Sequence, residues 1–255
     1  MGCGLYECVL DIMRRKLRHS VRVKSLLYRI LWLLPEHFRS STRVRIVLKK
    51  FADSKRENVF FLNIGANDGI AGDPLREFVV RYRWRGVLVE PVDFVFQRLQ
   101  AAYAGMPGIN CEHAALTDAS GSKAFWHLKK NVDLPPGYDQ IGSFNKDQVL
   151  KQTKLFPGLE SFITCTQVPG MTLAGILAKH HVEHVDVMLI DTEGYDFEVV
   201  KQIKPAGLMP SLVIYEHYHL SDSDQQECRA LLQSMGYAIE VCGGNTIASK
   251  GRNSV

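Results

Sequence analysis

Residues 57–69 read Glu-Asn-Val-Phe-Phe-Leu-Asn-Ile-Gly-Ala-Asn-Asp-Gly, and the rest of the chain is organised around this stretch. Its apolar part, residues 59–64, is rich in β-branched and aromatic side chains and stops abruptly at glycine, as expected of a buried parallel strand. Gly65 and Gly69 bracket the turn that follows, where glycine permits positive φ and close approach of a ligand. Apolar residues at helical spacing come next, over residues 74–82. A glycine turn between a strand and a helix predicts a nucleotide-binding site in an α/β sheet.

The spacing around this turn narrows the choice of ligand. Asn67 stands two positions after Gly65, where a dinucleotide fingerprint would have its second glycine, and no lysine follows Gly69 as in a triphosphate-binding loop. The next apolar strand ends in Glu90, 21 residues after Gly69, and a carboxylate there suits the two hydroxyls of a ribose. Asn63, with a neutral oxygen and nitrogen, could hold an amino-acid group. These features favour S-adenosylmethionine over NAD as the cofactor.

The charge of the chain is unevenly distributed. Residues 1–56 contain 14 Lys and Arg against four Asp and Glu, a net charge of +10, whereas the whole chain carries +4. Residues 57–255 therefore carry −6, which argues against a catalytic part that binds nucleic acid. A length of 255 residues suits one α/β domain with an extension. We divide the chain into a basic helical N-terminal extension, residues 1–56, and a cofactor-binding domain, residues 57–255.

Three segments of the extension have helical periodicity: residues 4–18, 21–34 and about 40–52. Their basic side chains could bring residues 1–50 to the surface of a membrane or to a partner. We favour a second interpretation, in which these helices pack on the domain and their charges are solvated. No run reaches the ~18 apolar residues of a membrane-spanning helix, and Arg29 interrupts the apolar stretch where a signal peptide would lie.

Cysteine and histidine do not form a metal-binding pattern. The six cysteines include no CxxC pair, so we expect free thiols in a reducing cytoplasm, with any contact to a membrane being peripheral. His180, His181 and His184 lie near a helix end without an acid in the motif, so solvated histidines are a better interpretation than a metal site. The sequence leaves open whether the chain forms a homo-oligomer.

From residue 57 onward, strand and helix patterns alternate, which predicts an α/β fold with a mostly parallel sheet. Residues 122–128 could form a hairpin with the strand near 109–116, and residues 237–249 resemble a closing antiparallel hairpin. The irregular segment 129–165 is expected to be a mobile cover over the acceptor side of the site. The other expected strands are 58–64, 86–90, 168–171, 185–190 and 212–215, and the expected helices are 73–83, 92–104, 145–154, 172–181, 197–203 and 225–235.

Polar residues follow five of these strands, and the carboxyl ends of parallel strands meet at one edge of a sheet, where ligands bind. They are Asn63 to Gly69, Glu90, Asp118, Asp191 to Glu193, and Glu216 with His217. Asp118 could accept a hydrogen bond from the exocyclic amine of an adenine, or it could simply be a turn residue. Asp191 and Glu193 are candidate active-site acids, although Asp191 or Thr192 could instead cap the next helix.

Histidines follow the strand that ends near residue 215. Strand alternation would place His217 and His219 on one face and Glu216 on the other. A histidine that titrates near neutrality is a candidate general base, and we take His217 as that candidate. A pair of surface histidines without a catalytic role is an equally good interpretation.

The same residues resemble the FkbM-type S-adenosylmethionine-dependent methyltransferases, over about residues 57–250. The resemblance implies a class I methyltransferase fold, which is Rossmann-like, and methyl transfer mostly to hydroxyls of sugars or natural products. The matching stretches are Leu62 to Gly69, Val89 to Pro91, Ala114 to Asp118, Ile141 to Ser143, Val168 to Leu173, Leu189 to Asp196 and Ile214 to Glu216.

The leading functional hypothesis is therefore an O-methyltransferase that acts on a small-molecule or glycan acceptor. Methyl transfer from a sulfonium needs alignment and a base for the acceptor hydroxyl, and Asp191, Glu193 and His217 are the candidates for that role. Alternatively, Asp191, Glu193 and Glu216 could hold Mg²⁺, since three carboxylates suit a hard cation. Two other functions stay open: an NAD-linked oxidoreductase, and a non-catalytic nucleotide-binding scaffold recruited to a membrane.

Overall fold

The computed structural model describes residues 42–55, 57–130, 140–153 and 158–250. Its centre is a seven-stranded sheet in the order β10-β11-β9-β8-β1-β2-β3. Five strands are mutually parallel, and β11 lies antiparallel between β9 and β10. The sequence prediction of a mostly parallel sheet with an antiparallel C-terminal hairpin is confirmed. The strands are β1 (Phe60–Ile64), β2 (Arg85–Val89), β3 (Ile109–Glu112), β8 (Val187–Ile190), β9 (Leu212–Glu216), β10 (Ala238–Cys242) and β11 (Asn245–Ser249).

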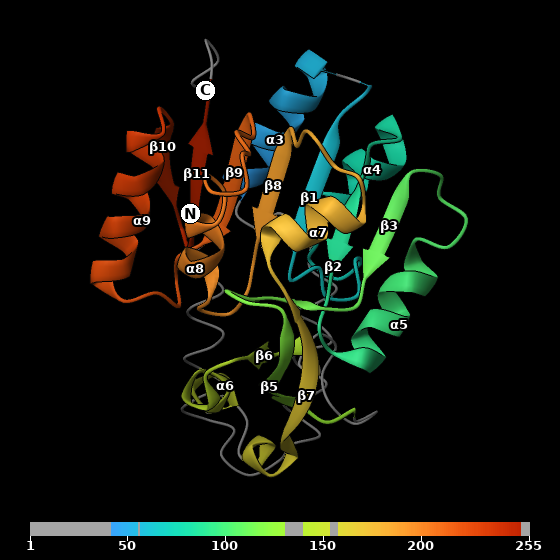
Figure 1. The fold of residues 1–255 in the computed structure, drawn as a ribbon, viewed down its shortest axis with the longest axis vertical. Coiled ribbons are helices and arrows are strands. Elements are labelled where there is room, and N and C mark those ends of the chain that lie inside the picture. The colour runs from blue at the N-terminus through green and yellow to red at the C-terminus, as the bar shows by residue number, and fades with distance from the viewer. Residues whose placement is uncertain (1–41, 56, 131–139, 154–157, 251–255) are drawn as a thin grey trace, which may run out of the picture.

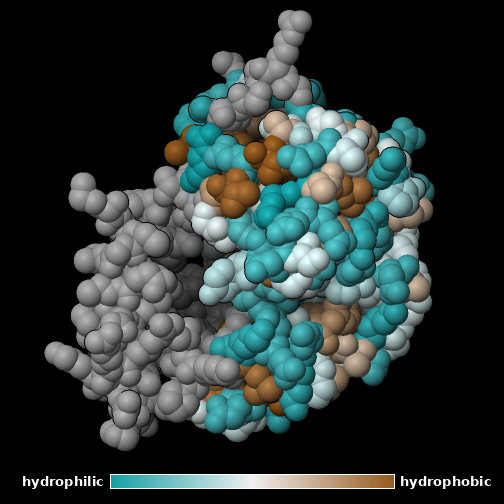
Figure 2. All heavy atoms as spheres, turned by 90° about the vertical axis from the view of Figure 1, so that its left-hand side faces the viewer, coloured by the Kyte–Doolittle hydropathy of each residue, from teal (hydrophilic) through white to brown (hydrophobic). Residues whose placement is uncertain are grey.

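Helices cover both faces of this sheet, because its central strands are apolar on both sides (Figure 1). In β1, Phe61 packs on one face of the sheet and Leu62 on the other. The face of Phe61 is covered by α3 (Thr42–Lys55), α4 (Arg76–Tyr82) and α5 (Asp93–Ala102). The face of Leu62 is covered by α7 (Leu173–Lys179), α8 (Asp196–Lys201) and α9 (Asp222–Ser234). The side of the molecule that carries α9 is mainly hydrophilic, with hydrophobic residues in separate small groups (Figure 2).

Helix α3 is the third helix predicted for the basic extension. Val44, Val47 and Leu48 are buried in the core, so this helix packs on the domain as we expected. The two helices predicted before it, and most of the proposed membrane contact through residues 1–50, lie outside the described residues. Among the helices that are described, none is both long and apolar enough to cross a membrane.

A second sheet of four strands, in the order β4-β7-β5-β6, lies beyond the carboxyl ends of the parallel strands (Figure 1). Its strands are β4 (Ala115–Leu116), β5 (Gly121–Leu128), β6 (Gly142–Ser143) and β7 (Ile163–Met171). The segment 129–165, expected to be irregular, thus contains β6, the start of β7, the predicted polar helix α6 (Lys146–Thr153) and the short 3₁₀ helix η3 (Leu159–Phe162).

Two strand predictions were wrong at this second sheet. The strand predicted over 109–116 divides, because β3 stays in the central sheet while β4 pairs with β7. The strand at 122–128 does not form a hairpin with it, since β5 pairs along its whole length with β7. The local turn at residues 118–121 favoured a neighbouring partner, whereas the actual partner comes from about 40 residues further along the chain.

Candidate functional site

A cleft lies between the carboxyl ends of β1, β2 and β8 and the second sheet, and it opens to solvent. This is the place where open α/β sheets bind ligands, because the chain leaves β1 toward β2 on one side and β8 adjoins β1 on the other. The walls are residues 64, 65 and 67 at the end of β1, residues 89–92 at the end of β2, residues 191–193 after β8, and residues 114–116, 125, 140, 142 and 144 from the second sheet and its loops.

Gly65 allows the ends of β1, β2 and β8 to pack closely against one another. Its φ is +80°, and a Cβ built there would lie 1.7 Å from the backbone oxygen of Asp191, so no other residue fits. The backbone N–H groups of Gly65 and Ala66 both donate to the carbonyl of Val89, over 3.0 and 2.9 Å. The glycine turn predicted after β1 therefore forms part of the wall of the cleft.

Glu90 is held at the edge of the cleft by backbone amides. Its Oε2 accepts a hydrogen bond from the N–H of Asn67 over 3.1 Å, and its Oε1 accepts one from the N–H of Val92 over 2.9 Å. Burial raises the pKa of Glu90 to about 7, although the two amides favour its ionised form. Each oxygen keeps a further lone pair, so the carboxylate can accept hydrogen bonds from ribose hydroxyls as predicted.

Three predicted cofactor contacts do not line the cleft. Asn63 is buried in β1, and its Oδ1 has no hydrogen-bond partner within the described part of the chain. Gly69 packs on α5, where a Cβ would lie 2.5 Å from the ring of Tyr103. Asp118 is exposed and pairs with Lys123 over 3.2 Å, because the division of the predicted strand moves this residue to the turn before β5. Asp118 thus fits the alternative of a turn residue.

The acids after β8 face the cleft instead of capping the next helix. The side chain of Asp196 accepts hydrogen bonds from the hydroxyl of Thr192 and the N–H of Gly194, over 3.0 and 3.2 Å, and neither Asp191 nor Thr192 caps α8. Burial, followed by the charges of Glu193 and Asp196, raises the pKa of Asp191 well above its usual range. Asp191 and Glu193 both line the cleft, as expected of active-site acids.

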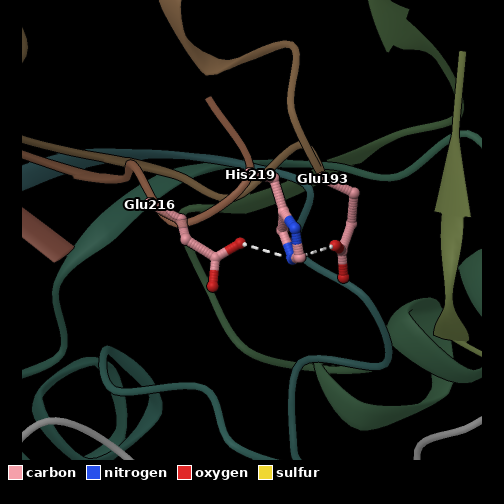
Figure 3. A group of neighbouring side chains, drawn as sticks. All are labelled: Glu193, Glu216 and His219. Carbon is pink, nitrogen blue, oxygen red and sulfur yellow. Dashed lines mark ion pairs between the residues drawn. The ribbon is translucent and has the colours of Figure 1, made fainter. Parts of the chain in front are cut away.

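His219 lies between two carboxylates beside this cleft. Its Nε2 is 3.0 Å from Oε2 of Glu193 and 3.5 Å from Oε2 of Glu216, and the three side chains point into the same space (Figure 3). Nδ1 of the same ring contacts the side-chain amide of the buried Gln148 in α6. We call Glu193, Glu216 and His219 the acid–histidine cluster.

The expectation from strand alternation was wrong here. β9 ends at Glu216, and the chain then turns, with the N–H of Leu220 donating to the carbonyl of His217 over 3.0 Å. The turn brings His219 back to the side of Glu216 and leaves His217 against β11, where its Nδ1 lies 2.9 Å from Oγ1 of Thr246. Burial lowers the pKa of His217. The structure therefore brings His219, and not the predicted His217, to the acids; the spacing of Glu216 and His219 across a turn was the only sign in the sequence.

Glu216 is the most perturbed member of the cluster. Burial, together with the charges of Asp191 and Glu193, raises its pKa to about 10. In the part of the chain that the structure describes, its Oε2 is buried and has no hydrogen-bond partner. This oxygen would be satisfied by a proton or by a bound cation.

Comparison with known proteins identifies the kind of domain. The family model described as the methyltransferase FkbM domain matches residues 63–239. The solved structure of the methyltransferase FkbM from Methylobacillus flagellatus KT is similar, with 11% identity and a TM-score of 0.52; the match covers 98% of this chain and 60% of that chain. This chain therefore spans about three-fifths of the length of that protein. No curated protein matches the sequence.

Two further solved structures resemble this chain more distantly. The precorrin-6y C5,15-methyltransferase from Geobacter metallireducens GS-15 has 11% identity and a TM-score of 0.42, over 82% of this chain and 88% of that chain. The fibrillarin from Aeropyrum pernix has 12% identity and a TM-score of 0.40, over 76% of this chain and 67% of that chain. The order of the central strands and the similarity to the Methylobacillus structure show the Rossmann-like fold of class I methyltransferases.

Proposed function

Because this chain belongs to the FkbM family of S-adenosylmethionine-dependent methyltransferases, we propose that it transfers the methyl group to a hydroxyl of a sugar, a glycan or another natural product. The family match gives no support to the alternative of an NAD-linked oxidoreductase. The family resemblance suggests the hydroxyl acceptor, and the chemistry of the acid–histidine cluster supports it.

The cleft suits the cofactor in its place in the fold and in its chemistry. The backbone of Gly65 and Asn67 borders the cleft closely, and Glu90 offers carboxylate oxygens to a ribose. When bound, S-adenosylmethionine supplies a methyl group on a positively charged sulfur, which is open to attack by an oxygen.

The observation that carries the proposal is that Glu193 lines the cofactor cleft while its carboxylate contacts His219. A group that removes a proton therefore stands directly beside the place of the cofactor, as attack by a hydroxyl requires. We assign this step to the acid–histidine cluster: the imidazole of His219 takes up the proton, and Glu193, 3.0 Å from its Nε2, stabilises the resulting positive charge. Proximity and alignment supply the rest of the rate enhancement.

An exposed tyrosine next to the cluster supports a sugar acceptor. Tyr218 is 72% exposed, and its ring packs edge-on against His219 with 4.9 Å between the ring centroids. An aromatic face beside polar groups provides the apolar surface and the hydrogen bonds that a sugar ring needs. The acceptor would then lie between Tyr218 and the cleft.

The test is methyl transfer from S-adenosylmethionine with an isotopically labelled methyl group to a panel of sugars and glycans. We expect a labelled methyl ether, which survives mild alkali, in contrast to a methyl ester. Glu193→Gln should reduce turnover by roughly a hundred- to ten-thousand-fold, up to the full contribution of the general base, because His219 loses the carboxylate that stabilises its protonated form. The matched control is Glu198→Gln, because Glu198 is a half-exposed acid of α8 that forms an ion pair with Lys201. Labelled ester or amine products, or full turnover in Glu193→Gln, would contradict the proposal.

A further inference from the structure

We propose that Glu193, Glu216 and His219 form a binding site for one divalent transition-metal ion. Each residue offers one ligand atom, a carboxylate oxygen or Nε2, and these atoms all lie within 4.8 Å of one another. Figure 3 shows the three side chains converging on one space, with Glu193 in the loop after β8, Glu216 at the end of β9 and His219 in the turn after it. The role of this ion in catalysis rests on the proposed function, whereas its binding does not.

The distances suit a shared ion. Two ligands at right angles on an ion with bonds of about 2.1 Å lie roughly 3.0 Å apart. The distance from Nε2 of His219 is 3.0 Å to Oε2 of Glu193 and 3.5 Å to Oε2 of Glu216. Small side-chain adjustments would therefore place all three on adjacent positions of one coordination shell.

Burial and charge also favour a cation. Oε2 of Glu216 is buried, and among the described residues it makes no hydrogen bond beyond its 3.5 Å contact with Nε2 of His219. Asp191, directly after β8, and the fully buried Asp196, at the start of α8, add two further carboxylates. Buried carboxylates need a compensating partner, and an ion would neutralise several of them at once.

The side chains around the cluster hold it as the outer shell of a metal site does. A histidine that binds a metal usually makes a hydrogen bond through its other ring nitrogen, and here Nδ1 of His219 contacts the amide of Gln148. The hydroxyl of Ser143 donates to the backbone carbonyl of Glu193 over 2.9 Å. Glu193 itself has a φ of +53°, an uncommon conformation that aims its side chain at His219.

This ligand set differs from the magnesium site expected from the sequence. His219 replaces Asp191, which does not belong to the group of converging ligand atoms. An imidazole with two carboxylates suits Mn²⁺, Co²⁺ or Zn²⁺ better than Mg²⁺, which prefers oxygen ligands. The positions opposite the protein ligands would be open to water or to the acceptor hydroxyl.

With the ion bound, the three side chains act as ligands, and the ion takes over the task of lowering the pKa of the acceptor hydroxyl. The hydroxyl releases its proton to solvent, to which the cleft opens. The acceptor oxygen then forms a bond to the methyl carbon as the bond from that carbon to sulfur breaks, which leaves S-adenosylhomocysteine and the methyl ether.

The test is a titration of the chelator-treated protein with Co²⁺, followed by visible absorption, and with Mn²⁺, followed by electron paramagnetic resonance. We expect one ion per chain in both titrations. Glu216→Gln and His219→Asn should each weaken binding by more than about a hundredfold, because each removes a ligand. Asp191→Asn should weaken it by less than about tenfold, and the control Glu198→Gln should leave it unchanged.

Binding of S-adenosylhomocysteine by each variant shows whether it is folded and tests the proposed function separately. If the ligand variants do not fold, Gln148→Leu provides a second test. It should weaken binding of the ion by roughly ten- to a hundredfold, since Gln148 positions His219 and is not itself a ligand. Three results would overturn the proposal: no binding of either ion to a protein that binds S-adenosylhomocysteine, binding that none of these variants changes, or binding lost in Asp191→Asn but kept in His219→Asn.

Discussion

Glu90 combines two properties that are rarely found together, full burial and a position at the edge of an open cleft. Its backbone hydrogen bonds to Asn67 and Val92 fix the carboxylate but do not offset the loss of hydration, so its pKa rises to about 7. In the absence of the cofactor, the carboxyl group that the site presents to a ribose is thus partly protonated near neutral pH.

This burial predicts a pH dependence of stability. The folded protein keeps a proton on Glu90 up to about pH 7, whereas the unfolded chain releases it near its ordinary pKa of 4.5. The stabilising contribution is therefore complete below pH 4.5 and is lost as the pH rises through 7. Relative to Glu90→Gln, the free energy of unfolding of the wild type should fall by roughly 3 kcal/mol over that range, measured by urea denaturation. If the free energies of unfolding of the wild type and Glu90→Gln change in parallel with pH, burial does not raise the pKa of Glu90 and the prediction is wrong.

The two histidines after β9 make a matched pair for a second prediction. His219→Asn should reduce turnover by roughly a hundred- to ten-thousand-fold, because His219 is part of the acid–histidine cluster. His217→Asn should keep turnover and lower the free energy of unfolding by roughly 1 kcal/mol, through the contact with Thr246. Steady-state kinetics and urea denaturation of both variants are the measurements. The reverse assignment of the two effects would restore His217 as the candidate base.

Sequence reasoning found the residues whose position follows from a strand end, and it missed those that depend on a turn. Gly65, Glu90, Asp191 and Glu193 all line the cleft as predicted, because each follows an apolar strand directly. The error at His219 arose because alternation was continued past the last residue of β9, and the strand end was not visible in the sequence.

At the level of elements, the turn after β1 fixes the relative positions of β1, β2 and β8. Gly65→Ala should destabilise the protein strongly and weaken binding of the cofactor, because a Cβ would collide with the backbone of Asp191. Gly72→Ala is the matched control: Gly72 has the same φ of +80°, but nothing lies within 4 Å of its Cβ position. The control should lower the free energy of unfolding by only roughly 1–2 kcal/mol, which is the cost of a non-glycine residue in the left-handed conformation. Gly65→Ala should lower it clearly more. Thermal and urea denaturation measure both effects. If Gly65→Ala and Gly72→Ala lose the same stability, the backbone of Asp191 shifts to accommodate the added Cβ.

The predicted elements were most accurate where helix and strand patterns alternate in sequence. All five parallel strands and the C-terminal hairpin were identified, with bounds that shifted by a few residues. The second sheet was not foreseen, because its main pair, β5 and β7, joins segments far apart in the chain. Residues 140, 142 and 144 of the segment expected to be a cover line the cleft, and the mobile cover itself stays a prediction.

For the whole molecule, the division between extension and domain needs a test, because α3 contributes to the core. Leu48 is fully buried against the sheet, whereas Ile46 of the same helix is 41% exposed. Leu48→Ala should lower the free energy of unfolding by roughly 2–5 kcal/mol, and Ile46→Ala by less than about 0.5 kcal/mol. A small effect of Leu48→Ala in urea denaturation would indicate that α3 unfolds separately from the domain.

The account as a whole depends on the identity of the cleft as the cofactor site, and calorimetric titration with S-adenosylhomocysteine tests this most directly. We predict that the wild type binds S-adenosylhomocysteine and does not bind NAD. Glu90→Ala should lose ~1.5–3 kcal/mol of binding free energy, because it removes hydrogen bonds to a charged group. Glu193→Gln should bind normally, since Glu193 acts on the acceptor side. Binding of NAD, or unchanged affinity for S-adenosylhomocysteine in a folded Glu90→Ala protein, would contradict the account.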